Sequence, residues 1–167
     1  MSTATIQETI RLWQAEPTKA QVKPVVKAHS DGVQGVFEAG SFSWRCDLPP
    51  SLGGTNAAPS PTALLLSALA GCAVVFICDT LAPQLGVRLE SVTAVAQCEA
   101  DFRGALGMDN AVPDFQNLQL MITIQSPDAE SQLQQLYEVW QQRCPIYLAL
   151  TKGLSVNTAL EIKNQSS

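Results

Sequence analysis

The spacing of apolar residues changes several times along the chain, and each spacing predicts a different element. Helical intervals come first and join Ile6, Ile10 and Trp13. They predict a short helix before Pro17, within an N-terminal extension of residues 1–18. From residue 21 to residue 48 the pattern becomes β-like, with runs broken at glycines. It predicts two or three antiparallel strands, the first of them in VKPVVKA (22–28).

The clearest helix start is Ser60-Pro61, where a good N-cap precedes a proline suited to the first helical turn. We expect Pro83 to end this helix. The stretch from Ala63 to Cys78 is apolar on every side, so a second helix or a second subunit must help a sheet to enclose it. Because this uncharged stretch is shorter than the ~18 residues of a bilayer span, it predicts a buried core helix and no membrane contact.

The second half of the chain alternates between strand and helix patterns. Residues 87–102 and 118–125 carry alternating or β-branched side chains and predict two strands. Ser126-Pro127 repeats the pattern of a cap followed by a proline. Behind it, helical spacing joins Leu133, Leu136, Tyr137 and Trp140. An amphipathic helix is therefore predicted there.

The last predicted elements are a short helix and a closing strand. The helix starts at Cys144-Pro145 and can end at Gly153, and the alternation over residues 154–162 predicts the strand. The predicted class is therefore α+β, in a single domain over residues 1–167.

Composition is consistent with one domain and limits the partners. A chain of 167 residues can bury one sizeable core. Its formal net charge of -5 argues against nucleic acid and against anionic membranes as partners. Charged residues make up only 15%, which leaves little polar surface for a monomer and suggests a large subunit interface. The first residues lack the basic and apolar regions of a secretory signal, so we expect a cytoplasmic protein.

The cysteine pattern argues against both disulfide and metal frameworks. The five cysteines are Cys46, Cys72, Cys78, Cys98 and Cys144. Their odd number, without an export signal, argues against structural disulfides. No two of them have C-x-x-C spacing and His29 is the only histidine, so neither a zinc site nor another cofactor is expected. Cys78 and Cys98 are interpreted as packing residues.

Three residues are candidates for chemistry. Cys72 follows Gly71 inside the apolar helix, where a glycine costs about 1 kcal/mol relative to alanine and suggests close approach of another backbone. Taken alone, Cys72 is more simply a small core residue. Cys144 lies at a helix N-terminus beside Arg143, and both features lower a thiol pKa, although a weak N-cap is an equally good interpretation.

The third candidate is Arg45, a guanidinium in the apolar-alternating FSWRC segment. It could bind a carboxylate or a peroxide oxygen, but an outward-facing strand residue is at least as good an interpretation. Cys46 alternates to the other face of the strand and is interpreted as a bystander.

Two motifs resemble those of the OsmC/Ohr family. LGGTNAAPSPTALLLSALAGC resembles that family's glycine-rich loop and Leu/Ala-rich helix ending in a cysteine, and RCPIYLAL resembles its second cysteine motif. They occur in the family's order, and the resemblance covers roughly residues 33–162. It implies an OsmC-like fold, with antiparallel sheets around long central buried helices in an intertwined homodimer.

The resemblance also implies chemistry at named positions. The cysteine matching Cys72 attacks a hydroperoxide and becomes a sulfenic acid, the one matching Cys144 resolves it as a disulfide, and a dithiol reductant restores both. Arg45 best matches the arginine that activates the first thiolate. Active members hold that arginine with a glutamate where this chain has Thr62, so we expect Thr62 to limit turnover. The alternative function is an OsmC-like small-molecule binding or scaffold protein with little or no peroxidase turnover.

Overall fold

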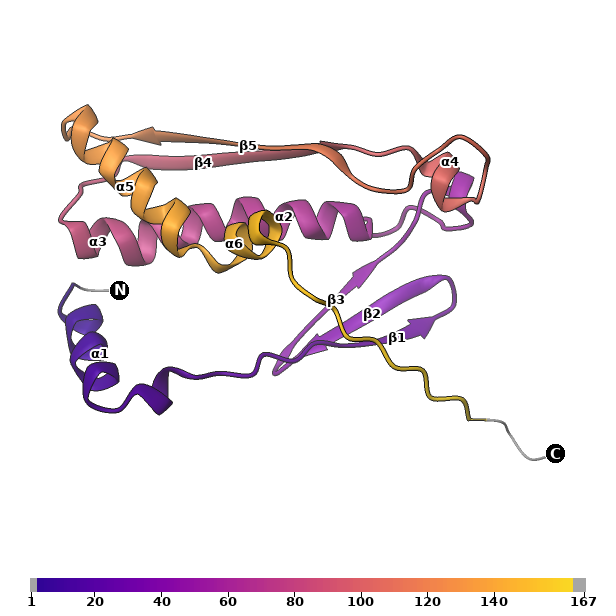
Figure 1. Ribbon diagram of the computed structural model, residues 1–167, viewed down its shortest axis with the longest axis horizontal. Helices are drawn as coiled ribbons and strands as arrows, with labels where there is room; N and C mark the ends of the chain where they lie inside the picture. Colours follow the sequence, from indigo (N-terminus) through magenta and orange to yellow (C-terminus); the bar gives the residue numbers. More distant parts are fainter. Residues whose placement is uncertain (1–2, 164–167) are drawn as a thin grey trace.

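The computed structural model describes residues 3–163, and its helices and strands confirm the mixed class (Figure 1). Met1 and Ser2 of the predicted N-terminal extension, and residues 164–167 of the predicted domain, lie outside the described residues. The first half contains α1 (Thr3–Ala15), η1 (Pro17–Ala20), β1 (Lys27–Asp31), β2 (Gln34–Ala39), β3 (Phe42–Cys46), η2 (Pro50–Leu52) and α2 (Pro61–Phe76). The second half contains η3 (Ile77–Leu81), α3 (Ala82–Leu85), β4 (Ser91–Glu99), α4 (Phe102–Ala105), β5 (Gln116–Gln125), α5 (Glu130–Arg143) and α6 (Pro145–Lys152).

The strands form two separate antiparallel sheets. β1, β2 and β3 follow each other in chain order, which confirms the predicted meander, and β4 pairs with β5. The first strand begins at Lys27 rather than at Val22, so the predicted start was wrong. Residues 22–26 are extended but unpaired, and Pro24 has no N–H to give to a ladder.

The core lies between the β4–β5 sheet, α2 with its continuation, and α5. Its fully buried members include Ala73, Ile77, Leu81, Leu136, Trp140 and Cys144. Alternate residues of the two strands, among them Val92, Ala94, Leu120 and Ile122, pack against this cluster. In Figure 1 the two strands run along α2, and α5 and α6 lie beside it. The strand alternation seen in the sequence therefore places one face of this sheet on the core.

The helix that starts at Pro61 does not end at Pro83, so that prediction was wrong. It passes through η3, a π-helical turn, into α3, which ends at Gly86 in a left-handed conformation (φ 70°). In a regular α-helix the proline ring would clash with the carbonyl of residue 79. In the wider π-helical turn the Ala82 N–H donates to the Ile77 carbonyl five residues back. This change from four-residue to five-residue hydrogen bonding makes room for the proline ring.

The resulting helical rod is longer than the sequence indicated. It runs from Pro61 to Leu85, which is 25 residues, and by length and composition alone it could cross a membrane. The uncharged stretch from residue 63 to residue 78 is shorter than a bilayer span, as predicted, but the helix that contains it is longer than one. A single chain does not enclose the helix on every side, since Val75 is 55% exposed.

The cap at Ser60 is confirmed, whereas the one at Ser126 is not. Ser60 accepts from the Ala63 N–H at 3.1 Å, with Pro61 in the first turn. α5 begins only at Glu130. Ser126 donates to the Arg88 carbonyl instead, and Asp128 accepts from the Arg88 guanidinium and its backbone N–H. These bonds hold the Ser-Pro-Asp segment against the start of β4, so it forms a turn and not a helix.

The predicted closing strand is absent from the described part of the chain. Residues 153–163 are extended without ladder partners, and their apolar side chains are exposed. The exposed fractions are 71% for Leu154, 81% for Val156, 85% for Leu160 and 72% for Ile162. This segment thus has the alternating apolar pattern of a strand, but among residues 3–163 no neighbouring strand pairs with it.

The loop between β3 and α2 is organised by Asp47, which is 2% exposed. Its carboxylate accepts from the Thr55 hydroxyl and from the backbone N–H groups of Ala57, Thr55 and Leu48. These bonds hold the pKa of Asp47 well below its usual range, with the Thr55 hydroxyl contributing most. Gly54 is required here because a Cβ would lie 2.0 Å from the Leu48 carbonyl oxygen.

We predict that Asp47→Asn lowers the free energy of unfolding at pH 7. The folded-state pKa of Asp47 is depressed, so its contribution is present above the usual 3.8 and is lost as the pH falls further. The difference between wild type and variant should therefore shrink below about pH 4. Urea unfolding between pH 7 and pH 3 measures it, with the exposed Asp114→Asn as control. A difference that is constant with pH would contradict this role.

Candidate active site

Two helices that are distant in the sequence bring Cys72 and Cys144 together. Their Sγ atoms lie 3.2 Å apart although 72 positions separate them. Cys72 is partly buried about three turns into α2, and Cys144 is fully buried at the junction of α5 and α6. The structure thus makes neighbours of the two cysteines that the sequence motifs singled out.

The α5–α6 junction explains how Cys144 faces Cys72. Cys144 has an extended backbone (φ -68°, ψ 113°), which Pro145 favours in the residue before it. Its backbone N–H still donates to the Trp140 carbonyl at 2.8 Å and closes α5. Cys144 occupies the N-cap position of α6, as predicted, but its thiol makes no capping bond, so the sulfur is free to contact Cys72.

Burial raises the pKa of the Cys72 thiol, and the adjacent Cys144 sulfur raises it further. The Ile146 backbone N–H, in the first turn of α6, acts in the opposite direction by hydrogen bonding to the sulfur. Burial dominates. Cys72 is therefore a neutral thiol at neutral pH within this single chain, and forming its thiolate requires a further positive group.

The hydrogen bonds and ion pairs of Arg45 and Arg143 go to residues other than the two cysteines. Arg143 donates to Gln84 Oε1 at 3.1 Å. Arg45 binds Gln34 and Asp31 within its own sheet, at 2.8 Å each. These bonds do not involve Thr62, which is half-buried in the first turn of α2. The roles expected of Arg45 and Thr62 stay predictions.

The remaining cysteines are free thiols in packing positions. Cys46 is buried on the face of β3 opposite Arg45, where a Cβ on Gly35 would lie 2.9 Å from its Sγ. Cys78 and Cys98 are half-buried. Burial, followed by the nearby Asp79 carboxylate, raises the pKa of the Cys78 thiol.

An apolar hollow of about 140 Å³ borders both cysteine-bearing segments. Leu69 lies one turn before Cys72, Trp140 one turn before Cys144, and Tyr147 three residues after Cys144; Leu120 and Leu150 are among the other residues that line it. Trp140 is 1% exposed, and its Nε1 has no hydrogen-bond partner among residues 3–163. Helical spacing predicted Trp140 as a core residue, but no pattern in the sequence indicates the hollow.

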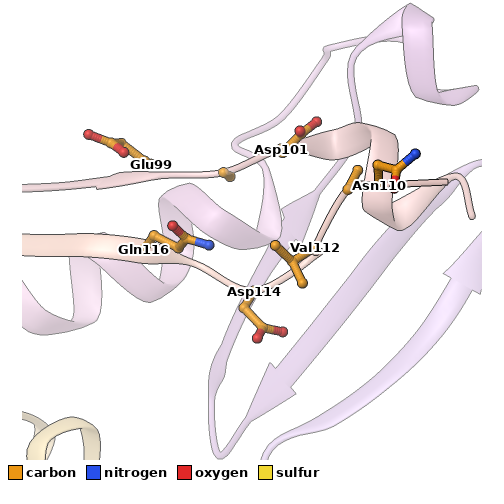
Figure 2. Close-up of a pocket in the computed structure, with 8 residues that line it drawn as sticks. Glu99, Asp101, Asn110, Val112, Asp114 and Gln116 are labelled. Carbon is orange, nitrogen blue, oxygen red and sulfur yellow. The ribbon is translucent and has the colours of Figure 1, made fainter. Parts of the chain in front are cut away.

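A larger hollow of about 420 Å³ lies away from the sulfurs, between the ends of β4 and β5 (Figure 2). Two of its carboxylates are already paired, since Asp101 binds Arg103 and Glu99 accepts from Asn117. No cysteine lines this hollow. Among residues 3–163, no group of three or more His, Cys, Asp and Glu side chains could hold a metal ion.

Comparison with known proteins points to one family. The model of the OsmC-like protein family matches residues 54–159, well over half of the chain. The curated proteins contain no match. Among solved structures, an OsmC-like protein from Mycoplasma pneumoniae aligns with a TM-score of 0.67 and 19% identity, over 80% of this chain and 90% of that one.

Two further structures share the fold. An organic hydroperoxide resistance protein from Elizabethkingia anophelis, with thiocyanate bound, has a TM-score of 0.59 and 19% identity, over 80% of this chain and 90% of that one. The organic hydroperoxide resistance protein OsmC from Legionella pneumophila has a TM-score of 0.53 and 23% identity, over 77% and 89%. At these identities the likeness establishes the fold.

We predict that mild oxidation with diamide joins Cys72 to Cys144 before any other pair. A disulfide needs a separation about 1 Å shorter than the present 3.2 Å, which a small side-chain movement can supply. Peptide mapping after acid quenching and thiol trapping identifies the pair. Cys144→Ser is the control, in which Cys72 should stay unpaired within the chain. Early pairing through Cys78 or Cys98 would contradict the geometry.

Proposed function

Because the chain belongs to the OsmC-like protein family, we propose that it is a cysteine-based thiol peroxidase that reduces organic hydroperoxides. The Cys72 thiolate attacks one peroxide oxygen, the O–O bond breaks, and the alcohol leaves with a proton; Cys72 is then a sulfenic acid. The Cys144 thiolate attacks the Cys72 sulfur, and water leaves as the disulfide forms. A dithiol reductant restores both thiols by exchange and is itself oxidised to a disulfide.

The observation that carries this proposal is the 3.2 Å separation of the two sulfurs. A sulfenic acid on Cys72 would form beside the thiol that resolves it, with no helix movement needed. Burial of Cys144 would also protect the resolving thiol from direct oxidation, since susceptibility follows exposure. Cys72, the more exposed of the two, is the one suited to meet the peroxide.

The reaction needs a cation to activate Cys72, because burial raises the pKa of that thiol. Arg45 is our candidate. Its planar, positively charged guanidinium can favour a thiolate or bind a peroxide oxygen. Arg45 of this chain or of a second copy would supply the charge when its sheet meets α2.

The apolar hollow supports an organic rather than an inorganic peroxide. Its wall is largely aliphatic and aromatic, and it touches the segments that carry both sulfurs. Burying an apolar group there would favour binding by about 25 cal/mol for each Å² removed from water. Hydrogen peroxide has no such group to bury.

We propose a homodimer as the working form. The rod from Pro61 to Leu85 is apolar, yet much of it is uncovered in one chain. A Cβ on Gly71 would meet no heavy atom within 4 Å among the described residues, so no close contact with these residues requires a glycine at this position. A glycine beside Cys72 instead suits close approach of the same helix from a second copy.

The extended C-terminal segment supports the same proposal. Four exposed apolar side chains between Leu154 and Ile162 would be covered if this segment paired with a sheet edge of the second copy. Such an exchange would supply the partner strand that the predicted closing strand lacks. Each two-stranded or three-stranded sheet would also gain stability from added strands.

The other proposed partners are small molecules. The hydroperoxide and a dithiol reductant are the reactants, and neither nucleic acid nor a membrane has a role. Five free cysteines suit a reducing compartment, so we place the protein in the cytoplasm.

A second candidate is an OsmC-like small-molecule binding or scaffold protein with little turnover. It is favoured by the raised pKa of Cys72 and by an arginine whose bonds go to its own sheet. Unchanged small-molecule binding in Cys72→Ser, together with negligible peroxide consumption by the wild type, would favour this alternative. Rapid consumption that Cys72→Ser abolishes would exclude it.

We predict that filling the hollow with Leu150→Trp slows oxidation of Cys72 by cumene hydroperoxide about tenfold or more, the effect of excluding an apolar substrate group from a pocket. Oxidation by hydrogen peroxide should change far less. Stopped-flow loss of free thiol measures both rates. Leu106→Trp, an exposed leucine outside the hollow, is the matched control. Equal slowing with the two peroxides would count against an organic-group site.

We predict that Gly71→Leu weakens the dimer by blocking close helix approach, whereas Gly71→Ala weakens it less. A Cβ at this position meets no heavy atom within 4 Å among the described residues, so we expect both variants to keep the monomer fold. Analytical ultracentrifugation from nanomolar to micromolar concentration gives the dissociation constants, and circular dichroism tests the fold. A monomeric wild type at micromolar concentration would end the dimer proposal.

A further inference from the structure

Arg45 is anchored at two nitrogens by two different strands. Its Nη1 donates to Gln34 Oε1 and its Nη2 pairs with Asp31 Oδ2, each at 2.8 Å. Asp31 ends β1, Gln34 begins β2, and the two residues face each other in the register of the hairpin. Arg45 pairs with Val36 on the neighbouring strand. The ladder of β1, β2 and β3 thus sets all three side chains together on one sheet, which Figure 1 shows below α2.

One of these two anchors is itself held in place. Gln34 Nε2 donates to Asp47 Oδ2 at 3.4 Å. Asp47 is almost fully buried and is fixed by Thr55, Ala57 and the backbone of Leu48. A hydrogen-bonded path therefore runs from the loop before α2, through Asp47 and Gln34, to the guanidinium.

We propose that Asp31 and Gln34 are positioning residues for Arg45 and take the part that a glutamate at position 62 would otherwise play. The inference rests on the proposed function, since Arg45 acts there on the Cys72 thiolate or the peroxide. It places the orienting carboxylate on the sheet of the arginine itself instead of on the helix of the cysteine. Arg45 is then oriented before its sheet meets α2.

The number of donors on Arg45 is compatible with this role. A guanidinium has five N–H donors in a fixed plane; one of them donates to Gln34, and Nη2 forms an ion pair with Asp31. The other donors remain to face a thiolate or a peroxide oxygen. A single exposed ion pair contributes little to stability, but two anchors on different nitrogens fix the plane of the group. A donor fixed in advance needs no reorganisation as charge develops in the reaction.

The experiment removes each anchor separately in the full-length protein. Asp31→Ala and Gln34→Ala test the anchors, Asp31→Glu restores the carboxylate, and Arg45→Ala identifies the arginine signals. Glu16→Ala is the matched control, because it removes a similarly exposed carboxylate from the ion pair with Lys19. Two readouts are taken: the ¹⁵N signals of the Arg45 guanidinium, and kcat and KM for cumene hydroperoxide.

We expect separate, slowly exchanging Nη signals for Arg45 in the wild type and averaged signals in Asp31→Ala. The value of kcat should fall between about tenfold and about a hundredfold, the loss expected for a misplaced catalytic group, with a smaller change in KM. Asp31→Glu should recover most of both readouts, and Glu16→Ala should change neither.

The outcomes separate this inference from the proposed function. If Arg45→Ala slows turnover while Asp31→Ala and Gln34→Ala do not, the function stands and the positioning role is wrong. If the wild type consumes no peroxide, the function fails. In that case unchanged guanidinium signals in both anchor variants would still overturn the anchoring, and averaged signals would uphold it.

Discussion

The second half of the structure depends on the packing of α5 against the helical rod. Leu136 and Trp140 are buried with Ala73, Ile77 and Leu81, and the inner face of β4 and β5 closes over them. This contact also fixes the sulfurs. Cys144 lies one turn beyond Trp140 and Cys72 directly precedes Ala73, so the packing that forms the core aligns the two thiols. The residues that form the core therefore also set the positions of the two thiols in the proposed reaction.

The proposed chemistry is divided between two parts of the molecule. The part around α2 holds both sulfurs and, by burying them, makes the Cys72 thiolate harder to form. The three-stranded sheet holds the arginine and its anchors. Neither part is sufficient alone for the proposed reaction. Activity would thus depend on how the sheet and the helix meet, which gives assembly a direct role in activation.

The elements that could be predicted are those whose conformation is determined by neighbouring residues in the sequence. Ser60-Pro61 starts a helix because the serine cap and the proline need only the backbone of the first helical turn. The meander follows from β-like runs of residues that are separated by glycine-containing turns. Ser126-Pro127 carries the same pattern but forms a turn, because Arg88, 38 positions earlier, competes for the serine hydroxyl. Residues 154–162 alternate like a strand but have no ladder partner among residues 3–163. Such misses arise where a distant residue or a missing partner decides the outcome.

The candidate site divides in the same way. The motifs around Cys72 and Cys144 were visible in the sequence, although Cys72 alone did not stand out from a packing residue and Cys144 alone could equally be a weak N-cap. The bonds of Arg45 to Asp31 and Gln34 were not visible, because they depend on hairpin register rather than on spacing along one element. The hollow beside Trp140 arises from the way three elements meet, which no single segment encodes.

The π-helical turn has a consequence for how the length of the rod can vary. A turn that closes five residues back accommodates one residue more than an α-helical turn of the same kind. Each residue of an α-helix advances the side-chain direction by about 100°. Deleting one residue between Ile77 and Leu81 would therefore rotate Pro83 and Leu85 relative to Cys72, while the first half of the rod kept its orientation. The π-helical turn thus sets the rotation of α3 relative to the Cys72 segment of α2, and buried residues lie on both sides of it.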